Sequence, residues 1–213
     1  MPIHTRLANA VVVGLLLVGG FGCTSVRVSS YVDPAYREAT PPKRVVVLAD
    51  LQDLAWRQSV ERATAEELSR AGLEALLALE VAPPTRTWTQ ESLLEHLKAQ
   101  GFEALVHVQL LTQGQRLESV PIETVTRVYE KGRPVQEIRT QTQGLEARQY
   151  AGLGLRLYAL PGGNVLWMGS AFAQNHFSLS GFFTSPDYEQ RYALRAAARR
   201  LARELGGLLR QSR

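Results

Sequence analysis

The run Arg44–Ala49 is the feature that most restricts the fold, because it is a short, uninterrupted series of mainly β-branched residues. Runs of this kind are typical of strands that are buried on both faces. The following segments alternate between helix and strand patterns: a helix begun by Asp50 and ended by Gly72, a strand over 73–79, a helix begun by Thr89 and ended by Gly101, and a strand over 102–111. Residues 44–111 therefore predict a β-α-β-α-β unit.

The next part of the chain changes to the period-2 alternation of half-buried strands. Apolar and threonine side chains alternate with polar ones over 120–128, a turn falls at 131–134, and a strand rich in Gln and Thr follows over 135–143. A second pair of alternating strands, 153–159 and 165–173, flanks a Pro-Gly-Gly-Asn turn. We expect two antiparallel hairpins, the first forming a polar ribbon that extends from the domain.

The last predicted element is a helix begun by Ser185-Pro186-Asp187, which supplies an N-cap, a proline at the first helical position and an acid in the first turn. Its inner face is a stripe of apolar residues at helical spacing, namely Leu194, Ala198, Leu201, Leu205 and Leu208. We therefore expect residues 43–213 to form a single α+β domain, in which a mixed sheet carries helices mainly on one face.

The first 22 residues have the layout of a secretory signal peptide, with a weakly cationic start, an apolar stretch and a glycine-rich end. The apolar stretch is shorter than the roughly 20 residues that a membrane-spanning helix needs. Cys23, the only cysteine, follows directly, and Gly20-Phe21-Gly22-Cys23 resembles the lipobox of bacterial lipoproteins. That resemblance implies cleavage before Cys23 and attachment of lipid, including palmitate, to its thiol. The alternatives are an ordinary signal-peptidase site or a short uncleaved anchor.

Residues 23–42 show no apolar periodicity, and their serines and prolines predict a tether between the lipid and the domain. We expect the domain to face the periplasm. Thr24 stands where enterobacterial lipoproteins retained at the inner membrane carry aspartate, so this resemblance favours the outer membrane. A single cysteine excludes an internal disulfide, so stability must come from the core. The formal net charge of +4 is too small to indicate a nucleic-acid partner.

Short sequence segments resemble those of known proteins. They are Gly101–Val106, before the third strand, and Leu155–Tyr158 and Val165–Gly169, in the last hairpin. With the export segment, they resemble small uncharacterised bacterial envelope lipoproteins. More distantly, the layout over 43–210 is similar to the periplasmic domain of the curli-secretion lipoprotein and the amino-terminal domain of the Tol-system translocation protein. These families include non-enzymatic parts of envelope assembly and secretion, and the resemblance brings no catalytic residues with it.

The sequence indicates no enzyme, metal site or cofactor. The histidines after the signal peptide, His96, His107 and His176, lie far apart without a metal-ligand spacing. Gly169-Ser170-Ala171 lacks the glycine that stands two residues before the serine in the hydrolase elbow. Gly152-Leu153-Gly154 lies inside an alternating strand, unlike a phosphate loop, and we expect it to mark a bulge or a close backbone approach.

Arginines repeat every four residues on the last predicted helix, at Arg191, Arg195, Arg199 and Arg203. Like charges at this spacing repel, so helix stability alone does not explain them. They suit anionic headgroups, an acidic partner or nearby carboxylates. The plainer interpretation is a solvated arginine face.

Two further features are candidates for contact with a partner. The segment before the last helix contains Phe177, Phe182 and Phe183, which predict either an exposed binding tip or a plug of the core. The polar hairpin from Val120 to Gln143 offers paired strands or an unpaired edge.

We therefore expect a non-catalytic, lipid-anchored cell-envelope protein that binds another envelope component in assembly, secretion or wall maintenance. A second hypothesis is a periplasmic carrier or sensor of a small apolar ligand, which a large apolar cavity between helices and sheet would favour over a flat, polar surface. The third, an envelope enzyme, requires a cleft where titratable groups converge.

Overall fold

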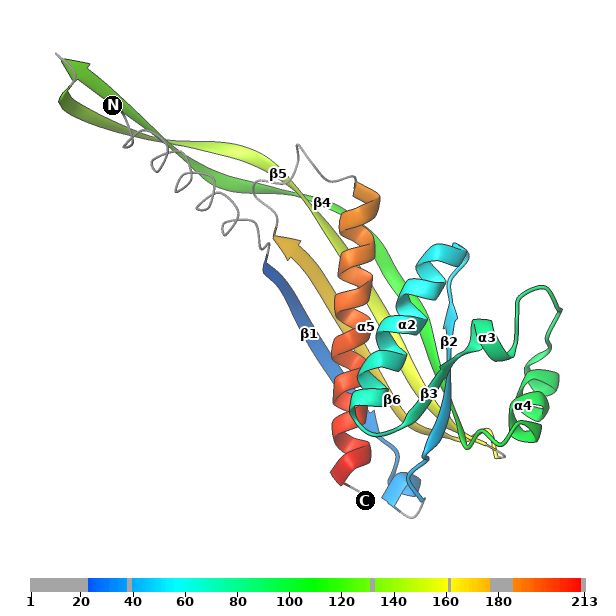
Figure 1. Ribbon diagram of the computed structural model, residues 1–213. Helices are drawn as coiled ribbons and strands as arrows, with labels where there is room; N and C mark the ends of the chain where they lie inside the picture. Colours follow the sequence, from blue (N-terminus) through cyan, green and yellow to red (C-terminus); the bar gives the residue numbers. More distant parts are fainter. Residues whose placement is uncertain (1–22, 38–39, 131–132, 161, 177–185, 212–213) are drawn as a thin grey trace, which may run out of the picture. The chain divides into compact units, whose positions relative to one another are not determined.

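The computed structural model describes residues 23–37, 40–130, 133–160, 162–176 and 186–211 (Figure 1). The signal peptide predicted for residues 1–22 lies outside them. The elements, in chain order, are β1 (Cys23–Val32), η1 (Pro34–Arg37), β2 (Arg44–Asp50), α2 (Leu54–Arg70), β3 (Glu74–Leu77), α3 (Ala78–Val81), α4 (Gln90–Ala99), β4 (Ala104–Glu130), β5 (Arg133–Ala159), β6 (Val165–His176) and α5 (Pro186–Gln211).

The strands form one six-stranded sheet in the order β1-β6-β5-β4-β2-β3. The strand β2 pairs in parallel with β3 and β4, as expected for a β-α-β-α-β unit, whereas β6 pairs antiparallel with β1 and β5. The predicted fold class, α+β with a mixed sheet and a carboxy-terminal helix, is thereby confirmed.

The chain divides into two compact units, whereas a single domain was predicted from the sequence. The described residues up to Gly114 and from Gln149 onward form the body, and Gln115–Arg148 form the hairpin unit. The strands β4 and β5 contribute to both units. In β5 the division follows a change in composition, because the Gln- and Thr-rich stretch over 135–143 lies in the hairpin unit and the alternating leucines over 153–157 lie in the body.

The predicted tether over residues 23–42 is wrong for its first half, because Cys23–Val32 forms the edge strand β1. Its register with β6 runs from Cys23 opposite His176 to Val32 opposite Trp167. Val26, Val28 and Val32 pack against the main core, so this strand buries one face. The short helix η1 then brings Tyr36 into the core, where its side chain is 4% exposed.

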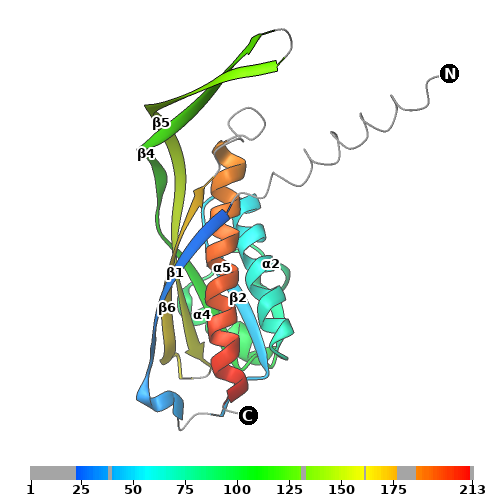
Figure 2. The same cartoon turned by 90° about the vertical axis from the view of Figure 1, so that its left-hand side faces the viewer.

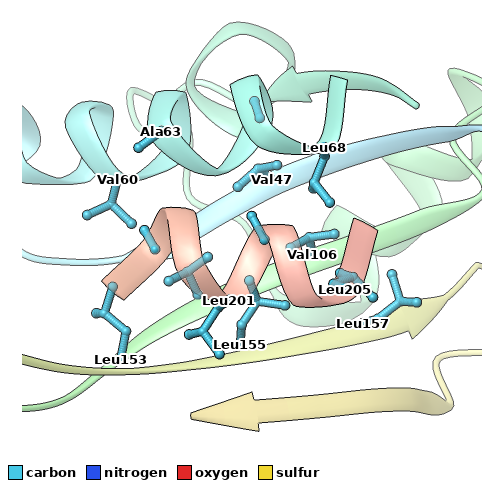
Figure 3. Close-up of a cluster of buried hydrophobic side chains, with 14 of the residues drawn as sticks. Val47, Val60, Ala63, Leu68, Val106, Leu153, Leu155, Leu157, Leu201 and Leu205 are labelled. Atoms are coloured by element: carbon cyan, nitrogen blue, oxygen red, sulfur yellow. The ribbon is translucent and has the colours of Figure 1, made fainter. Parts of the chain in front are cut away.

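The main core lies between the sheet and the helices α2 and α5, which Figure 2 shows on one side of β1 and β6. The alternation predicted for β5 places Leu153, Leu155 and Leu157 in this core, each fully buried. They face the predicted inner stripe of α5, of which Leu194, Ala198, Leu201 and Leu205 are buried (Figure 3). Burial of such side chains contributes about 1.5–3 kcal/mol each.

A smaller second core lies on the opposite side of β2 and β4. Successive residues of a strand point to opposite faces, so Val45 and Val47 join the main core while Val46 joins the second. Both faces of β2 are therefore covered, as its continuous apolar run predicted. The helix α4 supplies Leu97, and the turn after it supplies Phe102.

Helix boundaries follow local capping signals. The predicted N-cap Thr89 accepts a hydrogen bond from Ser92 N, and Gly72 and Gly101 end their helices with φ of 90° and 79°. The predicted N-cap Asp50 is wrong, since it is the last residue of β2. Asp53 caps α2 instead, and its side chain accepts from Trp56 N.

Candidate functional site: surfaces of the body and the hairpin unit

The body exposes large apolar side chains on the side of β1, β6 and β5 that faces away from the main core, which we call the outer face. The register places Arg27 beside Phe172 and Tyr31 beside Met168 on this face. Tyr31, Met168 and Phe172 are 55%, 42% and 41% exposed. The ring of Phe172 stacks on Tyr150 with centroids 5.6 Å apart. Because water contacts so much apolar area here, the outer face is a candidate contact surface.

A groove crosses the outer face where small residues from three strands share one row. Ser29 pairs with Ser170, which pairs in turn with Gly154. Taller side chains stand beside this row, among them Tyr31, Met168, Arg156 and Leu111, and the hollow has a volume of about 340 Å³. The Leu111 side chain approaches the backbone of β5 closely at Gly154, since a Cβ placed on this glycine would lie 3.3 Å from Leu111 Cδ2.

The strands β1 and β5 bring positive charge to the outer face. Arg27 and Arg156 are exposed, and neither Asp nor Glu occurs in β1, β6 or the body segment of β5. The combination of aromatic rings, methionine and arginine is the one enriched at protein–protein contacts. The residues of β1 lie more than 100 positions before those of β5 and β6, and sequence reasoning did not bring them together.

The arginine stripe of α5 is largely used within the body. Arg199 contacts Glu66 and Arg203 contacts Glu67, each at 3.3 Å, so both tie α5 to α2. Arg191 pairs with Asp187 at 2.6 Å within α5. Arg195 is exposed, and no ion pair to it is found among the described residues. Of the roles considered for the stripe, pairing with nearby carboxylates therefore applies to three of its four arginines.

Two of the predicted site features cannot be placed fully. Phe177, Phe182 and Phe183 lie outside the described residues. Cys23 is placed by its backbone as the first residue of β1, opposite His176. Its modification stays a prediction, but a lipid on it would be joined directly to a strand of the sheet.

The hairpin unit is a two-stranded polar ribbon. Ser119 Oγ donates to Gln143 Oε1 at 2.7 Å, while Arg127 pairs with Glu137 at 3.2 Å, so the strands run antiparallel. None of its side chains that the structure describes is buried. Its candidate role as a contact surface over Val120–Gln143 stays a prediction.

A second hollow of the body lies between α4 and the sheet and has a volume of about 270 Å³. Leu93 and Leu94 of α4 line one side, and Leu48, Leu105 and Tyr158 belong to the sheet. Polar groups are contributed by His107, Thr89 and Gln90, and Trp88 stands at the same hollow. We call this hollow the α4 pocket.

The histidines have different surroundings. His96 Nε2 lies 3.0 Å from Val81 O, and its ring packs on Trp88 with centroids 4.7 Å apart, so it supports the local structure. His107 lines the α4 pocket, where burial lowers its pKa; Arg156 acts in the same direction and Asp50 opposes it. The described residues contain no group of three or more His, Cys, Asp and Glu side chains arranged to hold a metal.

The lowered pKa of His107 predicts a loss of stability in acid. In the unfolded chain this side chain has an ordinary pKa of about 6.5. As the pH falls below that value, the unfolded chain takes up a proton that the folded chain binds less readily, so the free energy of unfolding falls. The loss stops once the folded side chain is also protonated. Urea titrations of the parent and of His107→Gln at neutral and acid pH should show a smaller loss in the variant; an equal loss would contradict the assignment.

Comparison with solved structures shows which known folds this chain resembles. The chain matches the PelC dodecamer from Paraburkholderia phytofirmans with a TM-score of 0.50 and 13% identity, covering 85% of this chain and 98% of that one. The fold resembles that of PelC. Lipoprotein GNA1162 from Neisseria meningitidis matches with a TM-score of 0.42 and 14% identity, over 76% of this chain and 99% of that one. No protein-family model and no curated protein matches the sequence.

At 13% identity, the likeness to PelC concerns the fold alone. Among the helices that the structure describes, none is both long and apolar enough to cross a membrane.

Proposed function

We propose that this chain is a lipid-anchored cell-envelope protein whose body binds another envelope component through the outer face, without catalysing a reaction. The observation that carries the proposal is the set of exposed side chains around the groove, Tyr31, Leu111, Met168 and Phe172. Side chains of this size are costly to leave in water, at about 25 cal/mol per Å² of apolar area. A partner that covers them gains that free energy.

The charge of the outer face supports a partner that carries acidic groups. Arg27 and Arg156 lie on opposite sides of the Ser29–Ser170–Gly154 row, since the register sets Arg27 beside Phe172 and Arg156 beside Met168. Arginines at the rim of an apolar contact contribute mainly to orientation and to the rate of encounter. An acidic protein surface with apolar side chains at its centre meets both requirements.

The anchor in this proposal is a lipid on Cys23. The signal-peptide layout of residues 1–22 supports it, as does the resemblance of Gly20-Phe21-Gly22-Cys23 to a lipobox. Because β1 begins at the modified residue, the acyl chains would be joined to the sheet without a spacer. The body would then stand at the bilayer surface, and its partner would be met there.

The anchor is tested by Cys23→Ser. We expect the parent to fractionate with membranes and the variant to be recovered in the soluble periplasmic fraction, because the serine hydroxyl does not replace the thiol in lipidation. Thr24→Ser, at the neighbouring position, is the matched control and should stay with the membranes. Intact mass of the extracted parent should show an acylated amino-terminal cysteine; an unmodified thiol on membrane-bound protein would overturn the anchor.

The contact surface is tested by photo-crosslinking in intact cells. We expect p-benzoylphenylalanine in place of Phe172 to give a discrete adduct, and the same residue in place of Leu54, which is 57% exposed on α2, to give none. Arg156→Glu should remove the adduct by reversing the charge beside the groove.

A second copy of the chain is the alternative partner, since PelC is a dodecamer, and it would give an adduct of twice the monomer mass. Equal labelling from both positions, or an adduct indifferent to Arg156→Glu, would contradict the proposal.

A further inference from the structure

We propose that the α4 pocket binds a small, uncharged and largely apolar molecule that carries one hydrogen-bonding group. This inference goes beyond the proposed function, because the pocket is lined by different residues from those of the groove. It identifies a ligand site on the part of the sheet that α4 covers.

The pocket is a gap in the second core. Leu48, Leu93 and Leu94 pack against that core but are only half-buried, unlike Leu97, which is 1% exposed. A well-packed interior leaves few voids larger than a water molecule. In a hollow of about 270 Å³ lined by leucines, apolar area therefore stays in contact with water. A ligand bound there would cover that area.

The walls of the pocket are held in place before any ligand arrives. Trp88 Nε1 donates to Pro83 O at 3.2 Å, and its ring packs against His96. The start of α4 is fixed by hydrogen bonds in both directions between Thr89 and Ser92. A preformed wall lowers the ordering cost of binding, which is the usual condition of small-molecule sites.

The polar groups of the pocket indicate an uncharged ligand. No Asp, Glu, Lys or Arg is among its described lining residues. His107 lies opposite Leu48 in the register of β2 and β4, and its ring centroid is 6.3 Å from that of Tyr158. Burial lowers the pKa of His107 from its ordinary value of about 6.5, although Asp50 opposes this shift. The neutral ring therefore predominates at pH 7, and it offers one donor and one acceptor. The surrounding rings and leucines supply the apolar contact.

The size of the pocket limits the ligand further. Drug-sized molecules occupy sites of about 300–1,000 Å³, so this pocket suits a molecule at or below the lower end of that range. A compact aromatic compound, or a short aliphatic chain with a polar end, meets the requirement.

The test uses the purified full chain with Cys23→Ser, so that no acyl chain competes for the probe. N-Phenyl-1-naphthylamine is the uncharged probe, and 8-anilino-1-naphthalenesulfonate carries the same rings with a negative charge. We expect the uncharged probe to bind saturably at one site, and the sulfonate to bind at least tenfold more weakly. Equal affinity for both, or no saturable binding, would overturn the proposal.

Two further measurements locate the site. Leu94→Phe, which fills the pocket, should weaken binding of the uncharged probe at least tenfold, while Leu54→Phe on the exposed surface of α2 should leave binding unchanged. Thermal unfolding of each variant controls for loss of the fold. In the parent, amide NMR shifts on probe binding should gather at Thr89–Leu94 and Leu105–His107. Shifts gathered at Met168–Phe172 would instead place the probe on the outer face and contradict the proposal, while leaving the proposed function untouched.

Discussion

Glu61→Leu is expected to lower the free energy of unfolding by about 3–5 kcal/mol, the cost of breaking a buried ion pair by removing one partner. Glu61 belongs to α2 and is fully buried. Its Oε1 accepts from Ala49 N at 3.1 Å and from Arg57 Nε at 2.9 Å, and its Oε2 accepts from Leu79 N at 3.2 Å. Leucine fills the volume but leaves these donors without an acceptor, and a buried donor that loses its partner costs about 1–3 kcal/mol.

The matched control for Glu61 is Glu66→Leu in the same helix. Glu66 is also ion-paired, to Arg199, but its side chain is 41% exposed. Water replaces the lost contact at such a site, so we expect a change within about 1 kcal/mol. Urea unfolding with unchanged m-values measures both variants. If Glu61→Leu is no more destabilising than Glu66→Leu, the carboxylate does not join α2 to the end of β2 and to α3 as the hydrogen bonds indicate.

The parts of the fold that could be predicted are those whose signal is local. Thr89 and Gly101 delimit α4 because an N-cap and a glycine with positive φ act within one turn of the helix. The inner face of β5 could be predicted from Leu153, Leu155 and Leu157, because the side chains of a strand alternate between its two faces. Each of these signals lies within about ten residues.

The edge strand β1 was missed because its signal depends on a distant partner. Val26 and Val28 alternate with Ser25, Arg27 and Ser29, and this short alternation is next to a proline-rich stretch that favours irregular chain. The strand is fixed by β6, whose Ala173 and Ala171 lie opposite the two valines. So short an alternation does not by itself specify a strand whose partner lies almost 150 positions away.

The partners of the arginine stripe and the residues of the groove could not be predicted, for the same reason. The repulsion expected between Arg199 and Arg203 is offset by Glu66 and Glu67, which are 133 and 136 positions away from them. The groove likewise takes Ser29, Gly154 and Ser170 from three strands. The sequence predicted a bulge or a close backbone approach at Gly152-Leu153-Gly154, but not the surface to which Gly154 belongs.

Gly169→Val is the second substitution for which we expect a large loss of stability, of about 3 kcal/mol, at the upper end for overpacking a core. A Cβ on Gly169 would lie 2.5 Å from Trp167 Cη2 and 3.1 Å from Leu201 Cδ2. Trp167 is 1% exposed, and Leu201 is fully buried in α5, so neither side chain has free space to move into. The ring of Trp167 thus occupies the space that a side chain at 169 would need.

Ser170→Val is the matched control, because it places the same side chain one position along β6, on the exposed outer face. We expect a change within about 0.5 kcal/mol there. A double-mutant cycle then isolates the cause. In a Trp167→Leu background the ring is absent, so Gly169→Val should cost clearly less than in the parent, with a coupling of about 1–3 kcal/mol by urea unfolding. Additive effects would show that the strain comes from the backbone of β6 rather than from the indole, and the assignment of Gly169 as the seat of the Trp167 ring would then be wrong.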